Sequence, residues 1–199
     1  MRTTTKNLFT LLGALALLGP AACKEAPKGS TSAPPAAPSS GPSSAPGAKS
    51  AGPALPLSAE ETAQLQPLLG DYEALRALLA DDKTEGVAAA AGRLEARASE
   101  LAAGGPAGAK ARLEKISAQA KALAQASGES MKASRLAFGE LSREVVGLLA
   151  AAPSLQAGLH VFECGMADGY QKWVQPAEEL ENPYMGHAML ACGSKTSWD

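Results

Sequence analysis

The chain has 199 residues, and its 18 lysines and arginines stand against 20 aspartates and glutamates, giving a formal net charge of -2 at pH 7. This balance argues against nucleic acid as a partner, because proteins that bind it usually present a basic surface. Hydrophobic residues make up 46% of the chain, and the part that follows the N-terminal region has the size of one ordinary domain.

The N-terminus has the pattern of a secretion signal. Arg2 and Lys6 precede an apolar run over residues 8–18, which is shorter than the about 20 residues that a permanent membrane span needs. We therefore interpret residues 1–22 as a cleavable signal peptide. Small residues lead directly into Cys23, which favours lipid attachment there, with ordinary cleavage nearby as the alternative. The lack of an aspartate after Cys23 favours the outer over the inner membrane, so we expect a lipid-anchored protein on the periplasmic side of the cell envelope.

Residues 23–56 form a tether in this interpretation. After the cysteine they are almost wholly Ala, Pro, Ser, Gly and Lys, without an aromatic residue. Such a composition cannot bury enough apolar surface to fold, so we expect disorder. The remainder divides into a helical bundle over residues 57–157 and a C-terminal motif over residues 158–199 that packs on it, together one domain.

The first half of this domain is predicted to form two helices. Ser58 and Glu61 fit a capping box at the start of the first, and Pro67 is expected to kink it or to begin a second segment. Asp82 and Glu85 repeat the capping pattern and are expected to open the next helix. Apolar residues recur at helical spacing through both stretches.

Two further helical stretches follow after short glycine- and proline-containing connections. One covers roughly residues 107–126, and the other runs up to Pro153. Short connections between amphipathic helices favour antiparallel neighbours. The predicted fold class is therefore all-α, an antiparallel four-helix bundle with a short C-terminal loop motif that contains cysteine and methionine.

The last forty residues hold both histidines, two of the three cysteines, three of the five methionines and both tryptophans. Residues 160–163 alternate as a short extended segment would. Two thiol and thioether pairs follow, and such soft sulfur ligands select Cu(I), or Ag(I) by analogy. The first ligand set to consider is Cys164, Met166, Met189 and Cys192, with His187 as an auxiliary ligand. The sequence does not decide between Cu(I), Ag(I) and Zn(II).

Other interpretations of these residues stay open. Cys164 and Cys192 could form a disulfide in an oxidising compartment, in which case no metal is bound. Free thiols, redox chemistry and a reversible disulfide that excludes metal are further alternatives. Met166 and Met189 could be core fillers, because methionine adapts to irregular gaps.

An enzyme is not predicted. A cysteine and a histidine could in principle form a nucleophilic pair, but the sequence offers no third group to orient the histidine. It also shows no isolated pair of carboxylates placed for acid-base chemistry.

The C-terminal motif resembles the family known as domain of unknown function 3347. The resemblance rests on Cys164-x-Met166-Ala167, Trp173 and Asn182-Pro183-Tyr184-x-Gly186-x-x-Met189-Leu190-x-Cys192-Gly193, with weaker matches at Ala80-Asp81-Asp82 and Arg135-x-x-Phe138-x-x-Leu141-Ser142. It extends over essentially the whole domain after the tether. One departure is Gly165, where the family usually has proline.

The resemblance implies a helical protein that handles heavy metals. Members occur as secreted or lipid-anchored proteins and as attachments to periplasmic adaptor subunits of copper and silver efflux pumps. The expected role is that of a metal buffer or donor linked to efflux. The expected protein partner is an efflux adaptor or a periplasmic metal chaperone, and the lipid anchor is expected to attach the protein to the membrane. The competing expectation is a disulfide-stabilised interaction module of the envelope without metal.

Overall fold

The computed structural model of the chain describes residues 54–198. The predicted signal peptide, Cys23 and nearly all of the tether lie outside these residues. The described elements are α1 (Ala59–Ala80), α2 (Val87–Gly104), η1 (Ala107–Ala109), α3 (Lys110–Ala126), α4 (Met131–Ala151), η2 (Pro153–Leu155), β1 (His160–Glu163), β2 (Lys172–Gln175), η3 (Gly186–Ala188) and β3 (Ser194–Lys195). Within this part of the chain, no helix is both long and apolar enough to cross a membrane.

The first helix begins as the sequence predicts. Ser58 caps α1 by accepting from the backbone N–H of Glu61, and the Glu61 carboxylate accepts from the Ser58 N–H in return. The helix then runs through Pro67, so no second segment begins there. Pro67 is exposed on the solvent side of the helix.

The predicted capping of the second helix by Asp82 and Glu85 is wrong. The helix α2 begins at Val87 after Gly86, whose φ of 87° is a left-handed conformation that glycine adopts without strain. Asp82 lies in the preceding turn with φ 54°. Its carboxylate accepts hydrogen bonds from the Arg135 side chain and from the backbone N–H of His187, so it links the turn to α4 and to the C-terminal segment.

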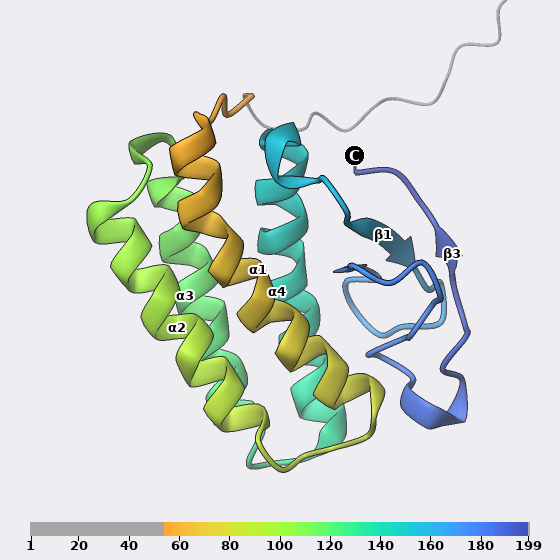
Figure 1. Cartoon of the computed structure of the whole chain (residues 1–199). Coiled ribbons are helices and arrows are strands. Elements are labelled where there is room, and N and C mark those ends of the chain that lie inside the picture. Colours follow the sequence, from red (N-terminus) through yellow and green to blue (C-terminus); the bar gives the residue numbers. More distant parts are fainter. Residues whose placement is uncertain (1–53, 199) are drawn as a thin grey trace, which may run out of the picture. The chain divides into compact units, whose positions relative to one another are not determined.

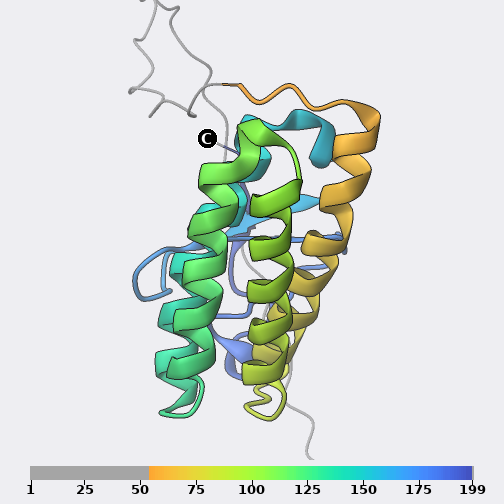
Figure 2. The ribbon, with the colours of Figure 1, turned by 90° about the vertical axis from the view of Figure 1, so that its left-hand side faces the viewer.

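The four predicted helices are confirmed and pack side by side, with consecutive helices running in opposite directions (Figures 1 and 2). The helix α2 packs against both α1 and α3, and α3 packs against α4. Their facing residues form the core. The fully buried members include Leu65, Leu68, Leu75, Leu79, Leu94, Leu113, Ile116, Leu123, Phe138 and Leu141.

The all-α fold class is wrong, because the C-terminal segment forms a three-stranded antiparallel sheet beside the bundle, in the order β2-β1-β3. The extended segment expected at 160–163 is confirmed as β1. In the sheet Phe162 lies opposite Trp173 on one neighbour and opposite Lys195 on the other. The strands have only two to four residues, and β1 pairs with β3 across a long stretch of chain, so local sequence periodicity does not reveal them.

The sheet shares a core with the helices. The strand β2 packs on α4, and the segment that leads into it lies close to Gly139, where a Cβ atom would be 3.3 Å from the Tyr170 carbonyl oxygen. An aromatic series crosses the junction, with ring centroids 5.7 Å apart for Phe138 and Tyr184 and 5.8 Å apart for Tyr184 and Trp173. Such contacts stabilise the packing beyond the area that they bury. The predicted C-terminal motif is therefore built into the same core as the bundle.

Candidate functional site

The sheet brings Cys164 and Cys192 together although 27 residues separate them. Cys164 directly follows β1, and Cys192 lies two residues before β3. Because Glu163 pairs with Ser194, the two cysteines come to the same end of the sheet. Their Sγ atoms are 3.1 Å apart, and both side chains are free thiols. Cys164 is fully buried, whereas Cys192 is partly exposed.

A tight turn holds Cys164. Its N–H donates to the Gln171 carbonyl at 3.1 Å, and its own carbonyl accepts from the N–H of Ala167 at 3.0 Å. The Gln171 side chain closes the turn by donating to the carbonyls of Gly165 and Ala167. A Cβ atom at Gly165 would meet nothing within 4 Å, so the turn has room for a larger residue there.

Buried Asn182 holds Cys192. The Asn182 side chain donates to the Cys192 carbonyl at 2.6 Å, and its oxygen accepts from the backbone N–H groups of Tyr184 and Met185. Gly193 follows with φ 138°, and a Cβ atom there would lie 2.8 Å from the Glu163 carbonyl oxygen. Glycine thus permits the close approach that places the two cysteines side by side.

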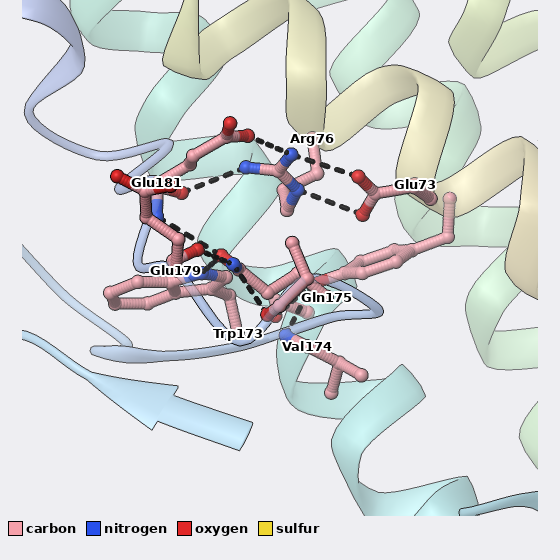
Figure 3. A network of polar contacts seen from close by, with 10 residues as sticks. Glu73, Arg76, Trp173, Val174, Gln175, Glu179 and Glu181 are labelled. Atoms are coloured by element: carbon pink, nitrogen blue, oxygen red, sulfur yellow. Dashed lines mark hydrogen bonds and ion pairs between the residues drawn. The ribbon is translucent and has the colours of Figure 1, made fainter. Parts of the chain in front are cut away.

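A second polar network fixes the chain that leads to Asn182 (Figure 3). Buried Arg76 of α1 binds both carboxylate oxygens of Glu73 and donates to the backbone carbonyl and the carboxylate of Glu181, all at 2.8 Å. Gln175 accepts from the Trp173 ring N–H at 2.9 Å and donates to the Glu179 carbonyl. The segment on the N-terminal side of Asn182 is therefore anchored to α1 and to β2.

The two thiols differ in acidity. Burial raises the pKa of Cys164, but hydrogen bonds to its sulfur outweigh burial and leave the pKa below its ordinary value. The donors are the Cys192 thiol, the backbone N–H groups of Met166 and Ala167 and the Asn182 side chain. For Cys192, the hydrogen bond to Cys164 is the largest cause of a raised pKa, and burial adds to it. Cys164 is therefore the more acidic thiol of the pair and Cys192 the less acidic one.

This arrangement gives Asn182 a place in the candidate site that the sequence interpretation did not assign to it. Asn182 belongs to the C-terminal motif, but its role appears only in three dimensions, because its amide contacts both cysteine segments. In the sequence, Asn182-Pro183 predicts a turn at this position, but it does not show which residues the Asn182 side chain contacts.

Within the described part of the chain, no side-chain hydrogen bond joins the other predicted ligands to the thiols, although the Met189 carbonyl accepts from the Cys192 N–H at 2.9 Å. The Met166 side chain is 60% exposed and lines a pocket that neither cysteine lines. Met189 is 40% exposed. His187 is exposed on η3, and its backbone N–H binds Asp82. Among residues 54–198, no three histidine, cysteine, aspartate or glutamate side chains are grouped to hold a metal ion.

The sulfur separation lies between the values that a metal and a disulfide require. Two metal–sulfur bonds of about 2.3 Å at a tetrahedral angle need sulfurs about 3.8 Å apart. A disulfide needs about 2.05 Å. The observed 3.1 Å is shorter than the first distance and longer than the second, so the two sulfurs must move apart to bind a metal ion and together to form a disulfide.

Comparison of the chain with models of protein families, with curated proteins and with solved structures finds no match in any of the three. The resemblance to domain of unknown function 3347 stays a prediction from the sequence motif.

Proposed function

We propose that this domain binds a soft metal ion, foremost Cu(I), through Cys164 and Cys192. The observation that carries the proposal is the pair of free thiols whose sulfurs lie 3.1 Å apart, and hydrogen bonds to Cys164 lower the pKa of one of them. The thiolate is the form of cysteine that binds metals, and soft sulfur donors select Cu(I) and Ag(I) over hard cations. The partial exposure of Cys192 gives an ion access to the pair.

In this proposal the protein acts as a metal buffer or donor rather than as an enzyme. Cys23 would anchor it to the envelope membrane, and the tether would let the domain reach an efflux adaptor or a metal chaperone. Donation needs an ion that can leave, and a site with two strong ligands and one exposed side releases its ion more readily than a closed site with four. The exposed Met166 and Met189 thioethers are not part of this two-thiol site.

The experiment is a titration of the reduced full-length chain with Cu(I) under anaerobic conditions, against a chromophoric competing chelator. Cys23 is replaced by serine in every sample so that only two thiols remain. We expect one Cu(I) per chain, with binding lost in Cys164→Ser and in Cys192→Ser. Met189→Leu is the matched control for the predicted ligand set, because its thioether makes no described contact with the thiols. Circular dichroism verifies that each variant retains its helices.

A disulfide-stabilised interaction module without metal is the second candidate, because the fold places the two free cysteines side by side. Closing the loop between the two cysteines would stabilise the fold by about 3.5 kcal/mol in the chain-entropy model. Free thiols are counted in the chain as isolated and after exposure to air. Both thiols oxidised as isolated, a lower melting temperature on reduction and no Cu(I) binding by the reduced chain would establish this candidate and overturn the metal site.

A further inference from the structure

A second sulfur cluster lies outside the thiol pair. Three methionines from separate segments line one surface pocket of about 260 Å³. Met131 is the first residue of α4, Met166 lies in the turn after β1, and Met185 precedes η3. Buried Tyr184 and Ala167 form part of the wall. Only the fold brings these three residues, which are distant in sequence, to one pocket.

These methionines are not ordinary core fillers. Met131 and Met185 are partly buried, and Met166 is 60% exposed at the pocket. A methionine that fills a core is expected to be covered by its neighbours, as Leu141 and Phe138 are in this protein. Each methionine side chain has three rotatable bonds and a polarizable sulfur, so the three can close around a small guest.

The charged groups around the pocket are largely engaged with one another. Lys132 and Asp168 pair across it at 3.4 Å. The Arg135 guanidinium donates to the Asp82 carboxylate and to the backbone carbonyls of Pro183 and Leu79. The pocket therefore presents no unbalanced cation that would repel a monovalent metal ion.

We propose that Met131, Met166 and Met185 form a thioether site for a soft monovalent cation, Ag(I) or Cu(I). Thioethers are neutral and soft, so they select such ions over hard divalent ions. They also need no deprotonation, and the site would work at low pH and when the thiols are oxidised. This goes beyond the proposed function, because the site stands even if Cys164 and Cys192 form a disulfide.

The site adjoins the thiol pair through one residue. Met166 lies in the turn that directly follows Cys164, and its side chain lines the methionine pocket. An ion held by the thioethers would contact Met166, which is two positions from Cys164 along the chain. The exposed methionine site would thus be the entry point, and the thiol pair the stronger site behind it.

The test uses Ag(I), which does not change oxidation state under these conditions, and the full-length chain labelled with ¹³C at the methionine methyl groups. The titration is run in parallel on the native chain and on a chain with all three cysteines replaced by serine. Methyl resonances report on thioethers alone, so thiol binding and thioether binding are separated. A failure of the proposed thiol function leaves this measurement unaffected, and if the cysteine-free chain does not fold, the native chain still answers the question.

In the cysteine-free chain we expect the resonances of Met131, Met166 and Met185 to shift together and to saturate with one Ag(I), while Met189 serves as an internal reference. In the native chain the thiol pair takes up the first Ag(I), and the same three resonances respond to the second. Met131→Leu and Met185→Leu should each weaken Ag(I) binding about tenfold or more, since leucine preserves volume and removes the sulfur. Met189→Leu should change it less than about twofold. Parallel shifts of all four methionines, or no shift with excess Ag(I), would overturn the proposal.

Discussion

Replacing Arg76 by methionine should destabilise the protein far more than the same change at Arg97. Methionine retains the apolar stem of arginine and removes the charge and the donors. Arg76 is 2% exposed and makes four hydrogen bonds, two to Glu73 and two to Glu181. Arg97 is 38% exposed and pairs with Asp71. The two variants therefore compare a buried ion pair with a surface one.

The magnitude follows from what each substitution leaves behind. Breaking a buried pair by removing one partner costs about 3–5 kcal/mol. The Glu73 and Glu181 side chains are 29% and 46% exposed, so water can solvate both carboxylates after Arg76 is lost, and we expect the lower end, about 3 kcal/mol. Exposed pairs contribute about 0–1 kcal/mol, and because Asp71 is only 16% exposed we expect the upper end, about 1 kcal/mol, for Arg97→Met.

The assay is urea unfolding followed by circular dichroism, with thermal melting as a second measurement. A domain of roughly 150 residues changes its melting temperature by about 3–4 °C per kcal/mol, so Arg76→Met should melt about 10 °C lower and Arg97→Met less than about 4 °C lower. Equal losses in the two variants would show that Arg76 does not hold the C-terminal segment to α1. A changed denaturant slope in Arg76→Met would instead indicate that this segment unfolds separately.

Three further measurements test the packing of the C-terminal segment. Gly186→Ala should destabilise the fold by more than about 2 kcal/mol, because φ is 58° and the new Cβ would collide with the Asp82 carboxylate. Gly92→Ala, which has open space around it, should stabilise α2 by about 0.5–1 kcal/mol. Equal effects of the two substitutions in urea unfolding would contradict this prediction. Ser142→Ala should lower the free energy of unfolding by about 1–3 kcal/mol, because the buried Ser142 hydroxyl is hydrogen-bonded to the Tyr72 hydroxyl at 2.7 Å. An unchanged free energy of unfolding would show that this hydrogen bond does not stabilise the fold. Burial is the largest cause of the raised pKa values of Tyr72 and Tyr184. The stability that their neutral forms contribute is therefore complete below about pH 10 and is lost as pH rises towards the folded-state pKa values. Unfolding at constant urea across about pH 9–12 measures this loss, and a stability that does not change with pH would refute the prediction.

Helix positions could be predicted because they depend on contacts close in sequence. Leu65, Leu68 and Leu75 repeat at helical spacing, and the Ser58 capping box uses residues three positions apart. The Asp82 pattern has the same local form but failed. Its carboxylate accepts hydrogen bonds from Arg135 and from His187, which are more than fifty positions away in the sequence. Gly86 precedes the first residue of the helix instead.

The candidate site could be predicted only as a list of chemical types. Sulfur residues in the last forty positions indicated soft-metal or disulfide chemistry. Their partners depend on the direction of each side chain: Cys164 meets Cys192, whereas Met166 lines a pocket with Met131, a residue that was not part of the predicted site. Asn182 acquires its role in the same way, through contacts with two segments of the chain.

The sequence by itself determined the four helices, their apolar faces and the concentration of cysteine, methionine and histidine near the C-terminus, because residue spacing and composition are local properties. The tertiary structure alone decided that β1, β2 and β3 form a sheet, that Cys164 is buried beside Cys192 and that three methionines share a pocket. Strands of two to four residues carry almost no periodic signal, and their pairing depends on burial against α4 and on hydrogen bonds between distant segments. The thiol acidities follow from that placement, since the donors to Cys164 come from its own turn, from Asn182 and from Cys192.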